Sequence, residues 1–274
     1  MKAGLLGLGG IIEPLADPKP GGVTRREGWR DLSIYSFAKA HEALRAALET
    51  SCIEGCRPGC LARGVNVYLS MLERLGLLSN TNLGTLILMI PLACAPHHQG
   101  PEAHAREASR CASLLGREDA RAYYRALERF YPSHLGTYEG PIPGVGSGKY
   151  PSTFLEILMA ARWDYVHFEL LSGYPKTLEA YYYLKTRGDS EESVARLILE
   201  FIARYGDTLI ARRHGWRAML RAMAEARLAL TGSRGEGLEK AILGLRREWR
   251  VRGWTPGAVL DIVAAGLGLY YLHG

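Results

Sequence analysis

Lysine, asparagine and glutamine are scarce in this chain of 274 residues. Only seven of the 34 Lys and Arg residues are Lys, and the chain contains three Asn and one Gln. A shortage of thermolabile amides together with abundant Arg is found in some families of heat-adapted proteins. The composition therefore indicates a thermophilic source.

Cysteine is also infrequent, and its number is odd. Five Cys do not suit the disulfide framework of a small secreted domain. Cys52, Cys56 and Cys60 recur every four residues, but a Pro-Gly pair interrupts any helix there and no Cys-x-x-Cys or His partner follows. A local disulfide or the packing of small residues is therefore favoured over a metal site, and Cys94 and Cys111 are predicted to fill the core.

Two structural patterns are missing. No stretch alternates with period two for long enough to indicate a strand, and no apolar run is long enough to span a bilayer. The run 83–95 is short and contains Pro91, and the run 258–272 contains Asp261, so both are predicted to be buried helices. We expect an all-α protein in which residues 1–274 form one domain of about ten helices.

The first dozen residues have a superficial similarity to a signal peptide. Glu13 and the abundant glycines are atypical of one, and a cytoplasmic protein is expected. The same glycines form a Gly-x-x-Gly-x-Gly-Gly string. No strand precedes it, so it does not indicate a dinucleotide-binding fold.

The formal net charge of +6 permits binding of nucleic acid, an anionic membrane or small phosphorylated molecules. Cations alternate with acidic residues along the apparent helices. Neither a basic tail nor a basic strip interleaved with aromatic residues is present, which argues against nucleic acid. Small phosphorylated partners are favoured, and no membrane association is expected.

Residues 14–31 combine three prolines with a Gly-Gly pair and cannot form a regular helix or an inner strand. The segment carries Lys19, Arg25, Arg26 and Arg30 together with Asp17 and Asp31. Cations suit phosphate oxygens, glycines permit close contact and carboxylates can hold a metal, so this first loop is predicted to bind a polyphosphate. The alternative is a solvated connector before a helix that Ser33 caps.

Two further segments place polar residues beside apolar helices. Asn80 and Asn82 precede the run 83–95, where they must either cap that helix or contact a ligand. Asp207 opens a later helix in which Arg212 and Arg213 lie within two turns of the start, and the helix dipole there favours anions. The long irregular stretch 131–151 is a possible lid.

Several motifs occur in order along the chain. The main ones are Pro18-Lys19-Pro20-Gly21-Gly22-Val23 with Asp31, Asn80-Thr81-Asn82-Leu83-Gly84, Asp207-Thr208-Leu209-Ile210-Ala211-Arg212 and Thr255-Pro256-Gly257-Ala258-Val259-Leu260-Asp261. Arg121-Ala122-Tyr123 with Leu135-Gly136, and Trp163-Asp164-Tyr165, also fit. Together they resemble the triphosphoribosyl-dephospho-CoA synthase family over nearly the whole chain.

The resemblance implies an all-helical enzyme that transfers the triphosphoribosyl group of ATP to the ribose of dephospho-CoA and releases adenine. Two departures stand out. Enzymes of this family carry Asn-Thr-His-Lys-Gly where this chain has Asn-Thr-Asn-Leu-Gly at 80–84, and Asn or Leu where this chain has Gly22. The chain is therefore placed in a divergent branch whose acceptor can differ.

Transfer at ribose C1′ calls for cations on the triphosphate, a metal and a carboxylate near the reacting carbon. The expected phosphate and nucleotide ligands are Lys19, Gly21, Arg25, Asn80, Asn82, Arg212 and Arg213. Asp31 and Asp207 are the expected catalytic carboxylates, and Asp31 and Asp261 the expected Mg²⁺ ligands. For Asn80 and Asp207 the alternative role is helix capping, and for the arginines it is surface ion pairing.

The first loop, the turn at 80–82 and the start of the Asp207 helix are predicted to converge on one cavity. Polar interruptions in an apolar helical chain cost least if they share a solvated site. Asp261 is then expected either to face this site or to have a structural role near a helix start. A homodimer is a further expectation, and a non-catalytic nucleotide- or nucleic-acid-binding protein is the alternative function.

Overall fold

The computed structural model describes residues 2–96, 100–131, 140–232 and 236–274. These residues form fourteen α-helices, and β structure within them is limited to two isolated bridges, which confirms the all-α class. The helices are α1 (Lys2–Leu15), α2 (Ile34–Ser51), α3 (Cys60–Arg74), α4 (Leu83–Cys94), α5 (Pro101–Ser113), α6 (Arg117–Phe130), α7 (Phe154–Ala160), α8 (Tyr165–Ser172), α9 (Pro175–Arg187), α10 (Glu191–Tyr205), α11 (Thr208–His214), α12 (Trp216–Thr231), α13 (Glu236–Arg252) and α14 (Gly257–His273).

The described chain has more helices than the ten or so predicted. One reason is that the segment after Asp207 divides into α11 and α12 at Gly215, whose φ of 84° lies in the left-handed region that glycine tolerates. A second reason is α1, whose many glycines obscured its helical character. The irregular stretch 131–151 contains no helix where it is described, and most of its first half lies outside the described residues.

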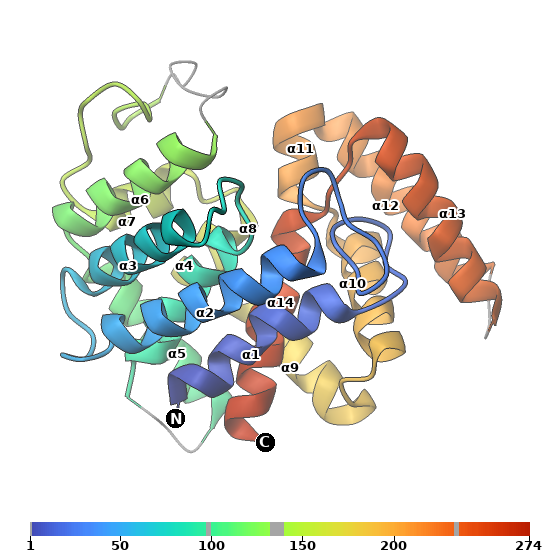
Figure 1. The fold of residues 1–274 in the computed structure, drawn as a ribbon, viewed down its shortest axis with the longest axis horizontal. Helices are drawn as coiled ribbons and strands as arrows, with labels where there is room; N and C mark the ends of the chain where they lie inside the picture. Colours follow the sequence, from blue (N-terminus) through green and yellow to red (C-terminus); the bar gives the residue numbers. More distant parts are fainter. Residues whose placement is uncertain (1, 97–99, 132–139, 233–235) are drawn as a thin grey trace.

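Glycines in α1 and α14 allow these two helices to pack closely. A Cβ atom on Gly9 would lie 1.8 Å from the Ala264 carbonyl oxygen, and one on Gly268 would lie 2.6 Å from the Leu6 carbonyl oxygen. In Figure 1, α14 passes through the centre of the molecule beside α1. Glycine is therefore required at this contact, although it costs helix stability elsewhere.

The buried helix predicted at 83–95 is confirmed as α4. All of its residues except Gly84 are buried, and Leu86, Ile87 and Leu88 are completely enclosed. Within the described residues, none of the helices combines the length and apolar character needed to cross a membrane. The apolar sequence of α4 is explained by its central position in the core.

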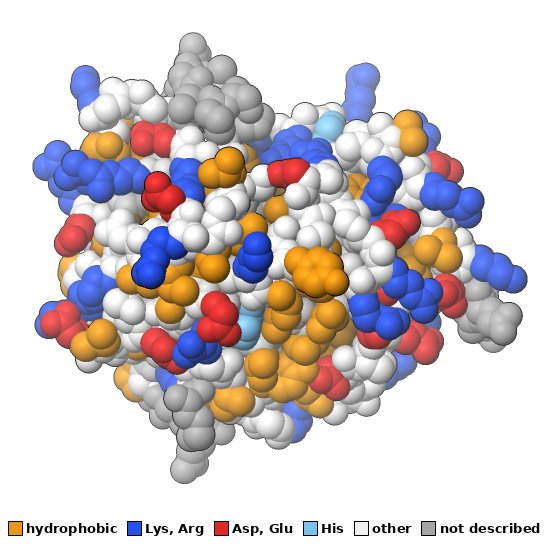
Figure 2. All heavy atoms as spheres, in the orientation of Figure 1, with side chains coloured by type: hydrophobic (Ala, Val, Ile, Leu, Met, Phe, Trp, Pro, Cys, Tyr) orange, Lys and Arg blue, Asp and Glu red, His pale blue; other side chains and the backbone are white. Residues whose placement is uncertain are grey.

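Helices α3 to α8 lie on one side of the molecule and α10 to α13 on the other, with α1, α2 and α14 between them (Figure 1). Basic and acidic side chains are interspersed over the face shown in Figure 2. The first loop joins α1 to α2. The cavity described below lies where this loop, the N-terminal ends of α4 and α14, and α11 meet.

Cys56 forms a disulfide with Cys111, with a Cα–Cα distance of 5.6 Å. The bond links the α2–α3 connection to α5, across 55 residues of sequence. The prediction that Cys111 lies in the core is confirmed, although its disulfide was not predicted, and the expectation of a local pairing for Cys56 was wrong. Sequence spacing could not reveal this pair because α5 approaches the connection only in the folded chain.

Candidate functional site

The main cavity has a volume of about 440 Å³ and is lined by all three segments predicted to converge. Residues 22–23 and 29–32 come from the first loop, 79–82 from the turn before α4, and Leu209 and Arg213 from α11. Further lining residues come from the C-terminal end of α6, the start of α14, and α1, α2 and α4. The predicted convergence is therefore observed.

Three arginines line the main cavity. Arg30 donates to the Gly253 carbonyl oxygen at 2.9 Å, and Arg129 donates to the Leu69 carbonyl oxygen at 3.2 Å. The Arg213 guanidinium lies 5.7 Å from the Tyr131 ring centroid. Burial lowers the pKa of Arg213, with like-charge repulsion from Arg30 contributing in the same direction. Arg30 and Arg213 are close enough to repel each other, and cations arranged in this way in a cavity wall favour an anion.

Asp261 lies in the wall of the main cavity at the start of α14. Its Oδ1 accepts hydrogen bonds from the Thr85 backbone N at 2.9 Å and from the Thr85 hydroxyl at 2.7 Å. Burial raises the pKa of Asp261 to about 7, and the nearby Glu13 carboxylate adds to the effect. A carboxylate with this pKa is suited to accept a proton at neutral pH.

Gly84 explains how Asp261 can approach α4 so closely. A Cβ atom at residue 84 would lie 2.0 Å from Asp261 Oδ2. No side chain fits in this space, so the glycine of the Asn-Thr-Asn-Leu-Gly motif is needed to seat the carboxylate. The motif and Asp261 therefore form one structural unit, although 176 residues separate Asp261 from Thr85.

Asn80 and Asn82 both line the main cavity, and both also hold the turn before α4. Asn80 Oδ1 accepts from the Leu83 backbone N at 2.9 Å, and its amide donates to the Tyr131 hydroxyl. Asn82 donates from Nδ2 to the Gly10 carbonyl oxygen at 3.4 Å. The capping alternative is thus realised for Asn80, while the position of both amides keeps them available to a ligand.

Asp31 is exposed, lines the main cavity and accepts a hydrogen bond from the Ser79 hydroxyl. Among the described residues, no group of three or more His, Cys, Asp or Glu side chains is arranged to hold a metal ion. The two predicted Mg²⁺ ligands, Asp31 and Asp261, nevertheless line the same cavity. This donor set fits Mg²⁺ that arrives with a triphosphate, because such ions take one or two carboxylates and complete their shell with phosphate and water.

Lys19 does not line either cavity. It is completely buried, pairs with the Glu13 carboxylate and donates to the Glu13 carbonyl oxygen at 3.0 Å. Burial lowers the pKa of Lys19, and attraction to Glu13 opposes that shift. Since Glu13 itself lines the main cavity, Lys19 supports the wall from behind and is not placed to contact a ligand.

Gly21 and Arg25 are also outside the cavities. A Cβ atom on Gly21 would lie 2.7 Å from Pro256 Cδ, so this glycine permits packing against the start of α14. Arg25 is exposed and its Nε lies 3.2 Å from Glu191 Oε1. The arrangement corresponds to the surface ion pair that was the alternative for this residue.

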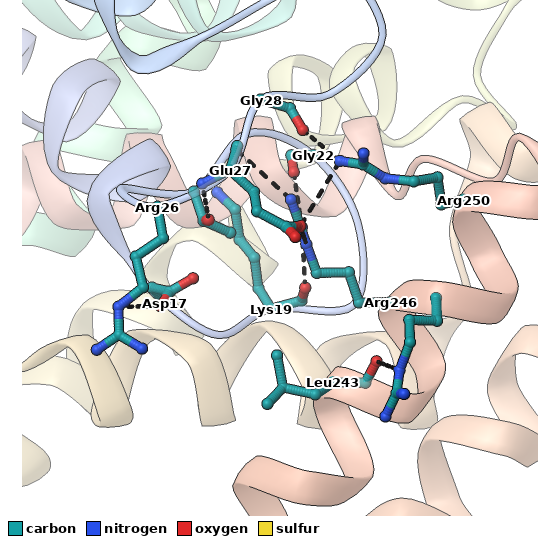
Figure 3. A network of polar contacts seen from close by, with 11 residues as sticks. Asp17, Lys19, Gly22, Arg26, Glu27, Gly28, Leu243, Arg246 and Arg250 are labelled. Atoms are coloured by element: carbon teal, nitrogen blue, oxygen red, sulfur yellow. Dashed lines mark hydrogen bonds and ion pairs between the residues drawn. The ribbon is translucent and has the colours of Figure 1, made fainter.

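The first loop is held in place by α13, which sequence patterns did not associate with the site. Arg246 donates to the Gly22 carbonyl oxygen at 2.9 Å and pairs with Glu27, and Arg250 donates to the Gly28 carbonyl oxygen (Figure 3). Arg246 is only 3% exposed. Side chains of α13 therefore fix the conformation of the first loop, and residues 29–32 of the loop line the main cavity.

Asp207 caps α11 and also binds the start of α14. Oδ1 accepts from the Ile210 backbone N at 2.9 Å, and Oδ2 accepts from the Val259 backbone N at 2.9 Å. Its side chain is completely buried and lines neither cavity. The structure thus gives Asp207 the capping position that was the alternative to its predicted catalytic role.

A second, smaller cavity of about 60 Å³ shares Asn80, Tyr131 and Asp261 with the main cavity. Arg212 lines it, and its guanidinium lies 3.6 Å from the Asp164 carboxylate, which caps α8. Behind them, the Tyr123 hydroxyl lies 3.0 Å from His167 Nε2. Burial lowers the pKa of His167, so the imidazole is neutral at pH 7.

Sequence patterns missed several residues of the site. Arg129, Tyr131 and Thr85 line the main cavity, as does Arg30, which was already among the cations predicted to suit a polyphosphate. Two of these carried a weak signal: Tyr131 stands at the start of the long irregular stretch, and Thr85 directly follows the 80–84 motif. Arg129 lies on an amphipathic helix with many charges, and nothing local distinguishes it from a solvated residue.

The cavity of this all-helical chain combines arginines with a carboxylate of raised pKa, a combination typical of sites for phosphorylated molecules. A family model for ATP:dephospho-CoA triphosphoribosyl transferase matches residues 3–274. The chain therefore belongs to this transferase family.

A solved structure supports the fold. The crystal structure of a candidate triphosphoribosyl-dephospho-CoA synthase from Archaeoglobus fulgidus matches with a TM-score of 0.66 and 19% identity, over 88% of this chain and 98% of that one. No curated protein sequence matched this chain. At this level of identity the structural match shows the fold alone. Membership of the family is shown by the family model.

Proposed function

We propose that this transferase moves the triphosphoribosyl group of ATP to a ribose hydroxyl of dephospho-CoA or a related acceptor, with release of adenine. The observation that carries the proposal is the position of Asp261, whose carboxylate has a pKa of about 7 and lines the same cavity as three arginines. This combination supplies an anion site and a base side by side.

The clustered arginines suit the triphosphate. Arg30, Arg129 and Arg213 approach the main cavity from the first loop, α6 and α11, so they can contact oxygens on different phosphates. We assign the phosphate contacts to these three arginines and no longer to Lys19 and Arg25, because Lys19 pairs with Glu13 and Arg25 pairs with Glu191.

The proposed reaction breaks the bond between C1′ of the ATP ribose and N9 of adenine, and forms a bond from C1′ to the acceptor oxygen. Adenine leaves with the bonding electrons and takes up a proton. Asp261 accepts the proton of the attacking hydroxyl, and the developing positive charge on the ribose is stabilised by the same carboxylate. We assign the ribose hydroxyls to Asn80 and Asn82.

We assign the Mg²⁺ that accompanies the triphosphate to Asp31 alone, where it would neutralise phosphate charge. Asp261 is kept as the base, because a carboxylate bound to Mg²⁺ would not keep a pKa of about 7. The acceptor is less constrained. Asn82 and Leu83 stand where the family has His and Lys, so this chain offers an amide and an apolar side chain instead of two groups that can carry positive charge. An acceptor with less negative charge at this contact is consistent with that difference.

The test is chromatography for free adenine after incubation of the protein with ATP, Mg²⁺ and dephospho-CoA, and with CoA and adenosine as alternative acceptors. We expect acceptor-dependent adenine release. Arg213→Ala should reduce kcat/KM by about 100-fold, corresponding to loss of a charged contact of roughly 3 kcal/mol. Arg217→Ala is the matched control, because Arg217 is exposed on the following helix and lines neither cavity.

Adenine release that is the same with and without these acceptors would contradict the proposal. Equal activity of the Arg213→Ala and Arg217→Ala variants would contradict it as well. ATP binding without any adenine release under these conditions would instead indicate a non-catalytic nucleotide-binding member of the family.

A further inference from the structure

All five cysteines lie in one region of the molecule. Cys52 ends α2, Cys56 lies in the α2–α3 connection, Cys60 begins α3, Cys94 ends α4 and Cys111 belongs to α5. Cys56 and Cys111 are already joined, which leaves three free thiols within the same packed region.

Two of these thiols are in direct contact. The Sγ atoms of Cys52 and Cys94 are 3.2 Å apart, although 42 residues separate them in sequence. Cys94 is 6% exposed, whereas Cys52 is partly exposed at the surface. Cys60 is completely buried and also makes a hydrogen bond with Cys94. The Cys94 thiol therefore has two sulfur neighbours, of which Cys52 is the one that solvent can reach.

We propose that Cys52 and Cys94 form a second disulfide bond, which ties the C-terminal end of α2 to the C-terminal end of α4, and that Cys60 remains a thiol. The pairing follows from the Sγ–Sγ contact and from the difference in exposure. An oxidant must first meet an accessible thiol, and only Cys52 meets that condition among the three.

The oxidant required is a small disulfide of the oxidised-glutathione class. The Cys52 thiolate attacks one sulfur of that disulfide, forms a mixed disulfide and releases one thiolate. Cys94 then loses its proton to solvent, attacks the Cys52 sulfur, closes the protein disulfide and releases the second thiolate. Its hydrogen bonds to Cys52 and Cys60, together with burial, raise the pKa of the Cys94 thiol, so this closure is the slower step. The two protein thiols lose two protons and two electrons, and the small disulfide is reduced to two thiols.

The second disulfide would anchor α4 at the end opposite to the site. The N-terminal end of α4 carries Thr85, which holds Asp261, and follows Asn82 in the main cavity wall. Lys2 donates to the Ala95 carbonyl oxygen directly after Cys94, so this end of α4 is also bound to α1. Intracellular disulfides are common in hyperthermophilic organisms, which agrees with the scarcity of thermolabile amides in the chain.

Peptide mapping by mass spectrometry tests the pairing. The protein is incubated with oxidised glutathione, alkylated under denaturing conditions without reductant, and digested. We expect a Cys52–Cys94 linked peptide beside the Cys56–Cys111 peptide, alkylation at Cys60 alone, and loss of both linked peptides after treatment with dithiothreitol. Alkylation of both Cys52 and Cys94, or a Cys60–Cys94 linked peptide, would overturn the proposal.

Two serine variants form a matched pair for stability under the same oxidising conditions. Cys60→Ser should keep both disulfides and melt within about 3 °C of the oxidised protein without substitutions. Cys52→Ser should lose one and melt roughly 5–15 °C lower, a shift that should vanish when both proteins are compared in dithiothreitol. Equal melting temperatures of the two variants under oxidation would count against the bond, and if a variant does not fold the peptide map of the unmodified chain decides.

Discussion

Two aspartates share a pKa raised to about 7 by burial but have different surroundings. Asp261 uses a single oxygen, Oδ1, to accept both hydrogen bonds from Thr85, and it lines both cavities. Asp207 uses both oxygens for backbone N–H groups of two helices and lines neither cavity. Replacement by Asn therefore has opposite consequences at the two positions.

Asp261→Asn should leave the fold intact and remove activity. The amide oxygen can still accept both hydrogen bonds from Thr85, while the base is lost, so we expect an unchanged or slightly higher melting temperature and a fall in kcat of about 10²–10⁴-fold. In the unmodified enzyme the base must be ionised, so kcat/KM should rise about tenfold per pH unit below pH 7 and level off above it. A pH profile that is flat from about pH 5.5 to pH 8.5, or a fully active variant, would remove Asp261 from the chemistry.

Asp207→Asn should unfold the protein more easily. One of the two N–H groups, from Ile210 or Val259, would then face an amide donor in a completely buried position. We expect a loss of about 1–3 kcal/mol in the free energy of unfolding, measured in urea. Adenine release per folded molecule should stay within about twofold, and a selective loss of activity without loss of stability would instead support a catalytic role.

Lys19→Ala should destabilise the protein strongly. The sequence pattern predicted that Lys19 contacts the triphosphate, but the structure shows a buried partner, Glu13. Removal of Lys19 leaves that carboxylate unpaired, at a cost of about 3–5 kcal/mol in denaturant unfolding. The double variant Glu13→Gln with Lys19→Met should recover most of this loss, and an equally unstable double variant would show that the ion pair is not the cause.

At the scale of elements, the contact between α1 and α14 depends on residues without side chains. A Cβ atom on Gly9 would meet the backbone of α14, whereas one on Gly4 in the same helix would have nothing within 4 Å. The first loop has a comparable dependence on another element, because Arg246 of α13 binds its carbonyl oxygens. Each of these elements is therefore placed by a distant partner.

Gly9→Ala and Gly4→Ala form a matched pair that tests the α1–α14 contact. The first change places a methyl group against the Ala264 carbonyl oxygen and should lower the free energy of unfolding by about 3 kcal/mol. The second removes a flexible residue from a helix at a position with open space and should raise stability by about 0.5–1 kcal/mol. Equal effects of the two substitutions would mean that close packing at Gly9 is not important.

At the scale of the whole molecule, the net charge of +6 is distributed and not gathered into a binding strip. Many arginines are paired with acidic residues, as Arg45 is with Glu42 and Glu49, and the face in Figure 2 shows both signs interspersed. Distributed charge of this kind does not track a nucleic-acid backbone. Three arginines of the described residues line the main cavity, where they could meet a small anion.

Binding to an arbitrary DNA duplex should therefore be weak. At micromolar protein concentration in about 0.15 M salt, we expect no binding of the duplex, while ATP binding persists under the same conditions. The measurement is fluorescence anisotropy of a labelled duplex over a salt series. A plot of log K against log salt with a slope of several units would revive the nucleic-acid-binding alternative.

The sequence by itself determined the class of the fold, the buried course of α4, the cap at Ser33, the membership of a transferase family and the segments that meet at the cavity. Each of these depends on residues close together in the chain: an apolar period of 3.6, a capping side chain before it, or a short motif. The tertiary structure decided which side chains are available to a ligand. Lys19 and Asp207 look free in the sequence, but their partners Glu13 and Val259 reach them only on folding.

The residues that were missed have the same physical origin. Arg129 carries no local mark of function, and it lines the cavity because α6 ends beside the turn at 79–82. Gly84 is recognisable as part of a motif, but its purpose, to admit the carboxylate of Asp261, depends on a contact between two helices far apart in the chain. Helix periods, caps and short motifs can be recognised from neighbouring residues. The burial of a side chain and its pairing depend on which distant element packs against it.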